Sequence, residues 1–183
     1  MAGSSSTSSA GSSPAELVAR ATGELRAAIA EYETATDEQS QYQLVQAYAM
    51  LGQAHDAIAR YRGRDDLVSL RCLAQAYVAD GRWPEAEEII ARAPEDAFML
   101  EQQADMFSRT GREEEALATW RRALDANPDS IGGHYMRAFL LDRMGRRAEA
   151  IAEWQAIVAW CRERGNDEDI EWPEREIARL RSA

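Results

Sequence analysis

The chain has 183 residues, with 32 acidic side chains against 21 basic ones, so its formal net charge is −11. This acidity excludes a general nucleic-acid binder, because affinity for phosphates depends on dense Lys and Arg. An apolar fraction of 45% is typical of a globular domain or of a repeat array of similar mass. All basic residues are Arg, which we interpret as the mark of a GC-rich bacterial genome and not as a chemical requirement.

The composition along the chain predicts three segments. Residues 1–13 are rich in Ser and carry too little apolar surface to offset the entropy cost of folding, so we expect a disordered leader. Residues 14–163 show helical periodicity throughout, and residues 164–183 combine an acidic linker with a final helix. No segment is apolar enough for a signal peptide or a membrane span, which favours a cytoplasmic protein without a membrane partner.

Helix signals begin at Ser13-Pro14, where Ser13 is a candidate cap and Pro14 suits the first helical position. No run of alternating β-branched residues predicts a strand, so the expected class is all-α. A regular series of glycines follows, with steps of 29, 29, 30 and 34 residues: Gly23, Gly52, Gly81, Gly111 and Gly145. This periodicity predicts a repeat architecture.

Other residue types keep a constant distance from these glycines. An alanine lies five positions after each one, at Ala28, Ala57, Ala86, Ala116 and Ala150. A large side chain lies nine positions after each one, at Tyr32, Tyr61, Ile90, Trp120 and Trp154. A small residue lets two helices approach closely, a glycine permits the turn between them, and large side chains fill the space between them. Each unit is therefore predicted to be a helix hairpin.

The segment from Ala104 to Pro128 closely resembles a tetratricopeptide repeat, on Ala104, Phe107, Gly111, Ala116, Trp120, Ala123 and Pro128. The resemblance implies a right-handed superhelical array of about four to five antiparallel hairpins. The units at Gly52 and Gly81 have shorter steps, so their second helices should be shortened. Residues 14–35 fit either a hairpin or one continuous helix through Gly23.

The last part of the chain is predicted to cap the array. Ile177 and Leu180 lie three apart on one face of a helix expected from about residue 169 to 182. Trp160 and Trp172 are candidates to pack at this junction.

No pattern predicts catalysis, a metal site or a cofactor. His55 and His134 lie in different repeats without further ligands at zinc-binding spacing, and no phosphate-binding or nucleophile motif occurs. Cys72 and Cys161 are expected to be buried reduced thiols, although a disulfide between them remains the alternative. We therefore expect a protein without enzymatic activity.

The resemblance places binding on the concave surface, which the first helix of each hairpin lines. The candidate groove residues mix aromatic rings, amides and charges: Tyr42, Gln46, Met50, Arg71, Gln75, Glu101, Asp105, Arg109, Tyr135, Phe139 and Arg143. Amides can bond a peptide backbone, and rings can take its apolar side chains. The cationic clamp that some members use for chaperone tails is absent, because the chain has no Lys and the matching positions are Tyr42, Gln46, Cys72, Phe98 and Gln102.

These features favour an adaptor, scaffold or helper protein that binds a partner protein or peptide, whose identity the residues do not indicate. A protein that associates with itself, at least as a weak homodimer, is the alternative. Exposure of Trp160 or Trp172 together with Ile177 and Leu180 would favour it.

Overall fold

The computed structural model describes residues 14–166 and 169–182, which form ten α-helices and, within these ranges, no β-strand. The predicted all-α class is confirmed. The helices are α1 (Pro14–Tyr32), α2 (Glu38–Met50), α3 (Ala54–Tyr61), α4 (Leu67–Asp80), α5 (Trp83–Ile90), α6 (Ala97–Arg109), α7 (Glu113–Ala126), α8 (Ile131–Arg143), α9 (Arg147–Glu163) and α10 (Glu171–Ser182).

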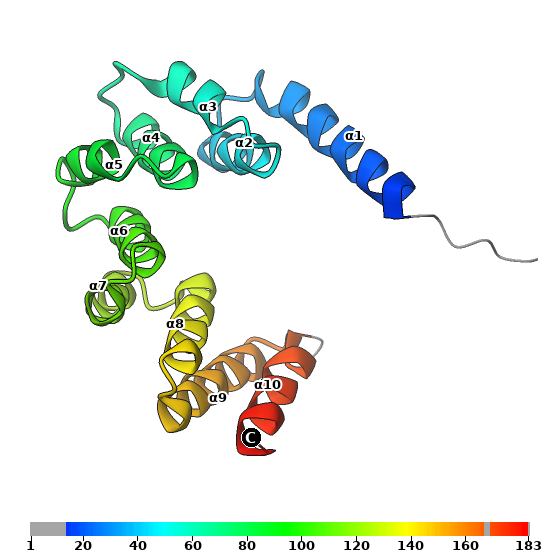
Figure 1. Cartoon of the computed structure of the whole chain (residues 1–183), viewed down its shortest axis with the longest axis vertical. Coiled ribbons are helices and arrows are strands. Elements are labelled where there is room, and N and C mark those ends of the chain that lie inside the picture. Colours follow the sequence, from blue (N-terminus) through cyan, green and yellow to red (C-terminus); the bar gives the residue numbers. More distant parts are fainter. Residues whose placement is uncertain (1–13, 167–168, 183) are drawn as a thin grey trace, which may run out of the picture.

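The helices form a curved array of hairpins (Figure 1). Helices α2, α4, α6 and α8 lie on the inner side of the curve, and their partners α3, α5, α7 and α9 lie on the outer side. Each outer helix contacts the inner helix of its own hairpin and the inner helix of the next one. This alternation joins the hairpins through one continuous hydrophobic core.

The turn from an inner helix to an outer helix depends on a glycine. Gly52, Gly81, Gly111 and Gly145 have φ values of 69°, 72°, 78° and 73°, in the left-handed region that ends many helices. After three of these turns an arginine pairs with a glutamate in the first turn of the outer helix, as Arg112 Nε does with Glu115 Oε2 at 2.7 Å. The negative charge lies where the helix dipole favours it.

The connection from an outer helix to the next inner helix has a different signature. Each of the inner helices α2, α4, α6 and α8 begins after a residue whose side chain accepts a hydrogen bond from a backbone amide of the first turn: Asp37, Asp66, Asp96 and Ser130. None of the outer helices α3, α5, α7 and α9 has such a side-chain cap. The two kinds of connection therefore identify the two kinds of helix.

Residues 14–32 form the single helix α1, which settles the alternative that the sequence left open. Gly23 lies inside this helix and has no positive φ, so no hairpin turn forms there. The proposed cap Ser13 and the Ser-rich leader 1–13 lie outside the described residues.

The repeat register predicts the core correctly in the units at Gly52, Gly81, Gly111 and Gly145, whereas Ala28 and Tyr32 of the first unit are only partly buried. Ala57, Ala86, Ala116 and Ala150 each have 0% exposure, and Trp120 and Trp154 are buried. The predicted shortening is also confirmed: α3 and α5 have 8 residues each, whereas α7 has 14 and α9 has 17. Cys72 and Cys161 are buried free thiols.

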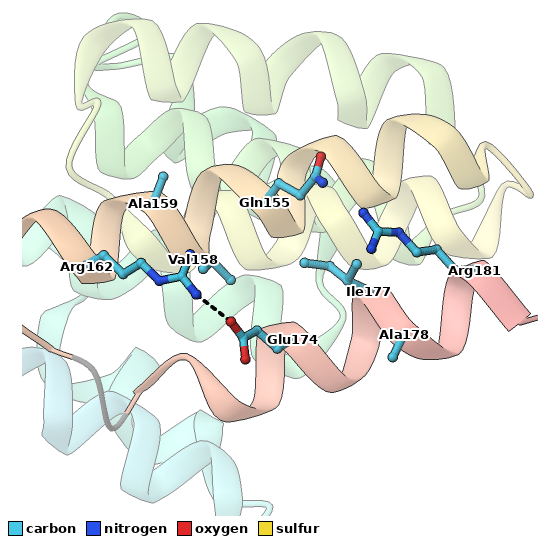
Figure 2. Close-up of a pocket in the computed structure, with 8 residues that line it drawn as sticks. All are labelled: Gln155, Val158, Ala159, Arg162, Glu174, Ile177, Ala178 and Arg181. Atoms are coloured by element: carbon cyan, nitrogen blue, oxygen red, sulfur yellow. Dashed lines mark hydrogen bonds and ion pairs between the residues drawn. The ribbon is translucent and has the colours of Figure 1, made fainter.

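Helix α10 packs on α9 through Ile177 and Leu180, which are both buried. It begins at Glu171, close to the predicted start. A groove of about 470 Å³ runs between α9 and α10 (Figure 2). Of the two tryptophans expected to pack at this junction, Trp172 packs against aromatic rings of α8 and α9, whereas the Trp160 ring is covered by Arg164 at 4.1 Å.

Candidate concave binding surface

The eleven predicted groove residues all lie on the inner helices α2, α4, α6 and α8. The structure divides them into three groups according to what each side chain contacts. One group lines an open groove, one is engaged in polar contacts between helices, and one belongs to an aromatic cluster.

The first group lies in a groove of about 350 Å³ that crosses α2, α4 and α6. Its walls contain five predicted residues, Gln46, Met50, Gln75, Asp105 and Arg109, together with Ala49, Val78, Ala79 and Gln102. Gln75 Oε1 is buried and has no hydrogen-bond partner among the described residues. Burying an amide oxygen without a donor is unfavourable, so a donor that reached this atom after a small movement of the side chain would remove that cost.

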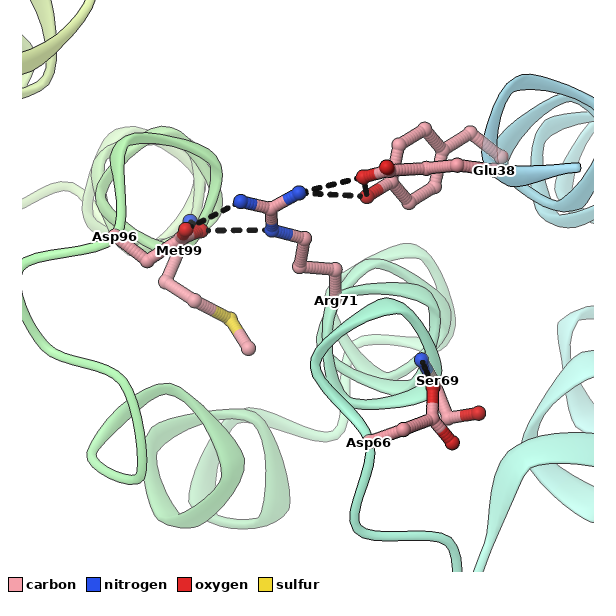
Figure 3. Close-up of polar contacts among 7 residues, drawn as sticks. Glu38, Asp66, Ser69, Arg71, Asp96 and Met99 are labelled. Carbon is pink, nitrogen blue, oxygen red and sulfur yellow. Dashed lines mark hydrogen bonds and ion pairs between the residues drawn. The ribbon is translucent and has the colours of Figure 1, made fainter.

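Arg71 belongs to the second group and bridges three inner helices (Figure 3). Its Nε donates to Asp96 Oδ1 at 3.0 Å, and its Nη1 donates to Glu38 Oε1 and to the Tyr42 hydroxyl. The Tyr42 ring stacks on Phe98 with centroids 4.8 Å apart. Both predicted residues, Arg71 and Tyr42, are therefore occupied by contacts within the protein.

The Arg71 contacts change the ionisation of the groups around them. Burial by itself would raise the pKa of Asp96, but the hydrogen bonds from Arg71 and from the Met99 amide hold that pKa below its usual value. Burial and the hydrogen bond to Glu38 raise the pKa of Tyr42 well above its usual value. At neutral pH, Arg71 therefore faces ionised Asp96 and a neutral phenol.

Glu101 and Arg143 are also engaged. Glu101 accepts a hydrogen bond from Ser130 Oγ at 2.5 Å, and burial raises the pKa of its carboxyl group. Arg143 Nε donates to Glu113 Oε1 at 3.0 Å, and Arg143 Nη2 donates to Ser108 Oγ at 2.9 Å. Neither side chain is in the groove that crosses α2, α4 and α6.

Tyr135 and Phe139 form the third group, a cluster with Trp154 and Trp172 that we call the aromatic cluster. The ring centroids of Tyr135 and Phe139 lie 5.2 to 5.6 Å from those of the two tryptophans. Trp154 is the fully buried member of the cluster, whereas Phe139 and Trp172 are 40% and 39% exposed. Exposed rings over an aromatic base can take an apolar side chain of a partner.

The described residues show no arrangement for other chemistry. Burial raises the pKa of the Cys72 thiol to about 12 and also raises that of Cys161, so neither is a ready nucleophile at neutral pH. Within the same residues, no group of three His, Cys, Asp or Glu side chains could hold a metal ion. No described helix is long and apolar enough to cross a membrane.

Comparison with solved structures identifies the arrangement. A thermophilic TPR protein of Thermus thermophilus, TTC0263, matches with a TM-score of 0.64 at 21% identity, over 91% of this chain and 95% of that one. MamA MSR-1 matches with a TM-score of 0.50 at 18% identity, over 80% of this chain and 98% of its own. The chain has a tetratricopeptide-repeat (TPR) fold. No family model matches the sequence, and no curated protein matches it.

The TPR array places three important residues that sequence reasoning did not assign to the concave surface. Glu38 and Asp96 hold Arg71, and Trp172 completes the aromatic cluster. Asp96 had a local signal, since an Asp before a helix is a common cap, but its contact with a side chain 25 residues earlier had none. Trp172 was expected to pack at the junction with the last helix, but its position beside the concave residues Tyr135 and Phe139 had no signal in the sequence.

Proposed function

We propose that the chain is a protein-interaction module that binds an extended segment of a partner protein in the groove across α2, α4 and α6. We place its role in the cytoplasm, as an adaptor, scaffold or helper protein that binds without catalysis. The observation that carries the proposal is the buried, unpartnered Gln75 Oε1 in a groove that also presents Gln46 and Gln102. A peptide backbone carries donors and acceptors that such amides can pair with.

The charges on this surface restrict the ligand. Arg71 is bound by Glu38 and Asp96, Arg109 pairs with Asp105 at 2.9 Å, and Arg143 pairs with Glu113. These contacts neutralise the three arginines that recur on the inner helices, on a chain of net charge −11. We therefore expect a segment without net negative charge.

Apolar contacts would supply the rest of the binding energy. Met50 is 72% exposed beside the groove, and a flexible thioether adapts to side chains of different shapes. The aromatic cluster further along the inner surface offers Phe139 and Trp172 to an apolar or aromatic side chain. A ligand that reaches both places would gain affinity from each.

The proposal can be tested with linear peptides selected from a random displayed library on the whole chain. Binding of a selected, fluorescently labelled peptide is then measured by anisotropy for the wild type, Gln75→Ala and Met50→Ala. We expect each substitution to weaken binding by about fivefold to tenfold. Gln155→Ala, an exposed glutamine on α9, is the matched control and should bind as the wild type does. Equal affinity of all variants would contradict the proposed groove.

A further inference from the structure

Side chains of α8 and α10 form a surface that changes from aromatic to charged along its length. On each helix the three residues concerned are spaced four and then three positions apart, so they share one helix face. We call this surface the α8–α10 strip, and it consists of Tyr135, Phe139 and Asp142 of α8 with Trp172, Glu176 and Arg179 of α10.

Contacts across the strip join the two helices at both of its ends. At the aromatic end, the ring centroids of Phe139 and Trp172 lie 5.5 Å apart. At the charged end, Arg179 Nη2 donates to Asp142 Oδ2, and Arg179 Nε donates to Glu176 Oε2 at 2.8 Å. Exposed rings and carboxylates therefore lie beside each other on one surface.

The charged end of the strip is negative overall. Arg179 is one cation against the two carboxylates of Asp142 and Glu176, which are both partly exposed. The second oxygen of each carboxylate has no hydrogen-bond partner among the described residues, so both can accept a further bond. The aromatic end is also close to a negative charge: burial raises the pKa of Tyr135, and Asp169 raises it further.

The rings of the strip lack a contact that this chain makes at other rings. In three pairs the guanidinium carbon of an arginine lies 4.0 to 5.0 Å from a ring centroid: Arg82 on Tyr77, Arg112 on Phe107 and Arg164 on Trp160. Such stacking is favourable because the face of an aromatic ring is negative. No arginine of the described residues lies over Phe139 or Trp172 in this way, although the two rings are 40% and 39% exposed.

We propose that the α8–α10 strip binds an arginine side chain of the partner segment. The guanidinium group stacks on Phe139 and Trp172. Its N–H groups donate to the free oxygens of Asp142 and Glu176. This inference rests on the proposed function, in which the segment lies along the inner surface. It narrows the apolar or aromatic side chain expected at the aromatic cluster to one that also carries a positive charge.

Arginine is the side chain that meets both requirements of the strip. Its stem is apolar, and its flat, weakly hydrated guanidinium group can stack on rings while it bonds a carboxylate. The ammonium group of lysine is strongly hydrated and has no flat face, so it fits the rings less well. A leucine would fit the rings but would leave the carboxylates without a partner.

The proposal can be tested with the tripeptide acetyl-Gly-Arg-Gly-amide and its citrulline counterpart, which has almost the same shape but no charge. Nuclear magnetic resonance follows the indole N–H signals of the five tryptophans, and Trp172→Phe identifies the Trp172 signal. We expect the arginine tripeptide to shift this signal with a Kd on the order of millimolar. The citrulline tripeptide should bind at least about fivefold more weakly. Added salt should weaken binding of the arginine tripeptide alone.

Two substitutions separate the contribution of the rings from that of the charge. Phe139→Ala should weaken binding of the arginine tripeptide by about fivefold. Glu176→Gln should weaken it by about twofold to threefold and leave the affinity for the citrulline tripeptide unchanged. Trp160→Ala on α9 and Glu88→Gln on α5 lie outside the strip and are the matched controls, which should bind as the wild type does. Circular dichroism verifies that each variant remains helical.

The proposal is overturned if the two tripeptides bind equally or if neither shifts the Trp172 signal. Wild-type affinity in Phe139→Ala would also overturn it, as would tighter binding of acetyl-Gly-Leu-Gly-amide, which would make the strip an apolar site. The groove across α2, α4 and α6 shares no residue with the strip, so Gln75→Ala should not change tripeptide binding. A selected peptide that requires Gln75 but binds Phe139→Ala normally would sustain the groove and overturn the strip.

Discussion

The N-terminal and C-terminal halves of the array hold their inner surfaces together by different interactions. In the first half, where the outer helices α3 and α5 are short, the charged side chains of Glu38, Arg71 and Asp96 connect α2, α4 and α6. In the second half, where the outer helices are longer, the aromatic cluster joins α8, α9 and α10. Polar contacts are geometrically specific but screened by water, whereas aromatic burial contributes more free energy.

The open groove across α2, α4 and α6 lies in the first half. Short outer helices supply less apolar surface there, and the inner residues of the first half keep amides and small side chains at the surface. In the second half the rings fill the corresponding space. We therefore expect the stability of the first half to depend more on pH and salt, and the stability of the second half to depend more on side-chain packing.

The largest expected effect is that of Trp154→Ala. Trp154 is fully buried and contacts three aromatic rings, so its removal leaves a large cavity and should lower the free energy of unfolding by roughly 3 to 5 kcal/mol. Urea denaturation followed by circular dichroism measures this loss. Trp172→Ala is the comparison variant and should cost clearly less, because Trp172 is 39% exposed. Equal losses would show that the cluster does not stabilise the second half through burial.

A smaller effect is expected from Arg71→Met in the first half. The substitution leaves the Glu38 and Asp96 carboxylates without their shared cation and should cost roughly 1 to 3 kcal/mol at neutral pH. Because the folded-state pKa of Asp96 is lowered, its contribution is present above the usual pKa of Asp and is lost as pH falls through the lowered value. The difference between wild type and variant should therefore shrink below about pH 3.9.

Arg143→Met serves as the control for this prediction, since its pair with Glu113 is more exposed and should contribute no more than about 0.5 kcal/mol. Thermal denaturation of both variants across a pH series makes the comparison. If the stability lost in Arg71→Met does not depend on pH, Arg71 stabilises the fold through packing of its aliphatic stem and not through its charge.

The smallest expected effect is a gain in stability from Glu101→Gln. Burial raises the pKa of Glu101, so the ionised carboxylate opposes folding at neutral pH, and the neutral amide can still accept the hydrogen bond from Ser130. We expect the free energy of unfolding at neutral pH to increase by up to about 1 kcal/mol. Thermal denaturation should show this gain as a higher melting temperature. The gain should decline as pH falls through the raised pKa of the folded carboxyl group and vanish below about pH 4.3, where this group is protonated in the unfolded chain as well. Glu88→Gln at an exposed site of α5 should change nothing, and a stability loss in Glu101→Gln would show that the charge is needed.

The sequence alone determined the class, the hairpins and the core of this protein. From Gly52 onward, glycines at regular steps, alanines five positions later and large side chains nine positions later predicted turns and close helix contacts that the structure contains; at Gly23 no turn forms. The shorter steps predicted the short helices α3 and α5. These features are local, because a helix, its cap and its turn depend on residues within a few positions of one another.

Only the tertiary structure decided which concave residues are open. Gln46, Met50, Gln75, Asp105 and Arg109 share one groove. Arg71 is held by residues on two other helices, and Tyr135 and Phe139 are joined to Trp172 from the last helix. The periodic pattern shows that such residues lie on inner helices. It does not show which of them meet, because contacts between side chains in successive repeats depend on how the helices pack and how the array curves.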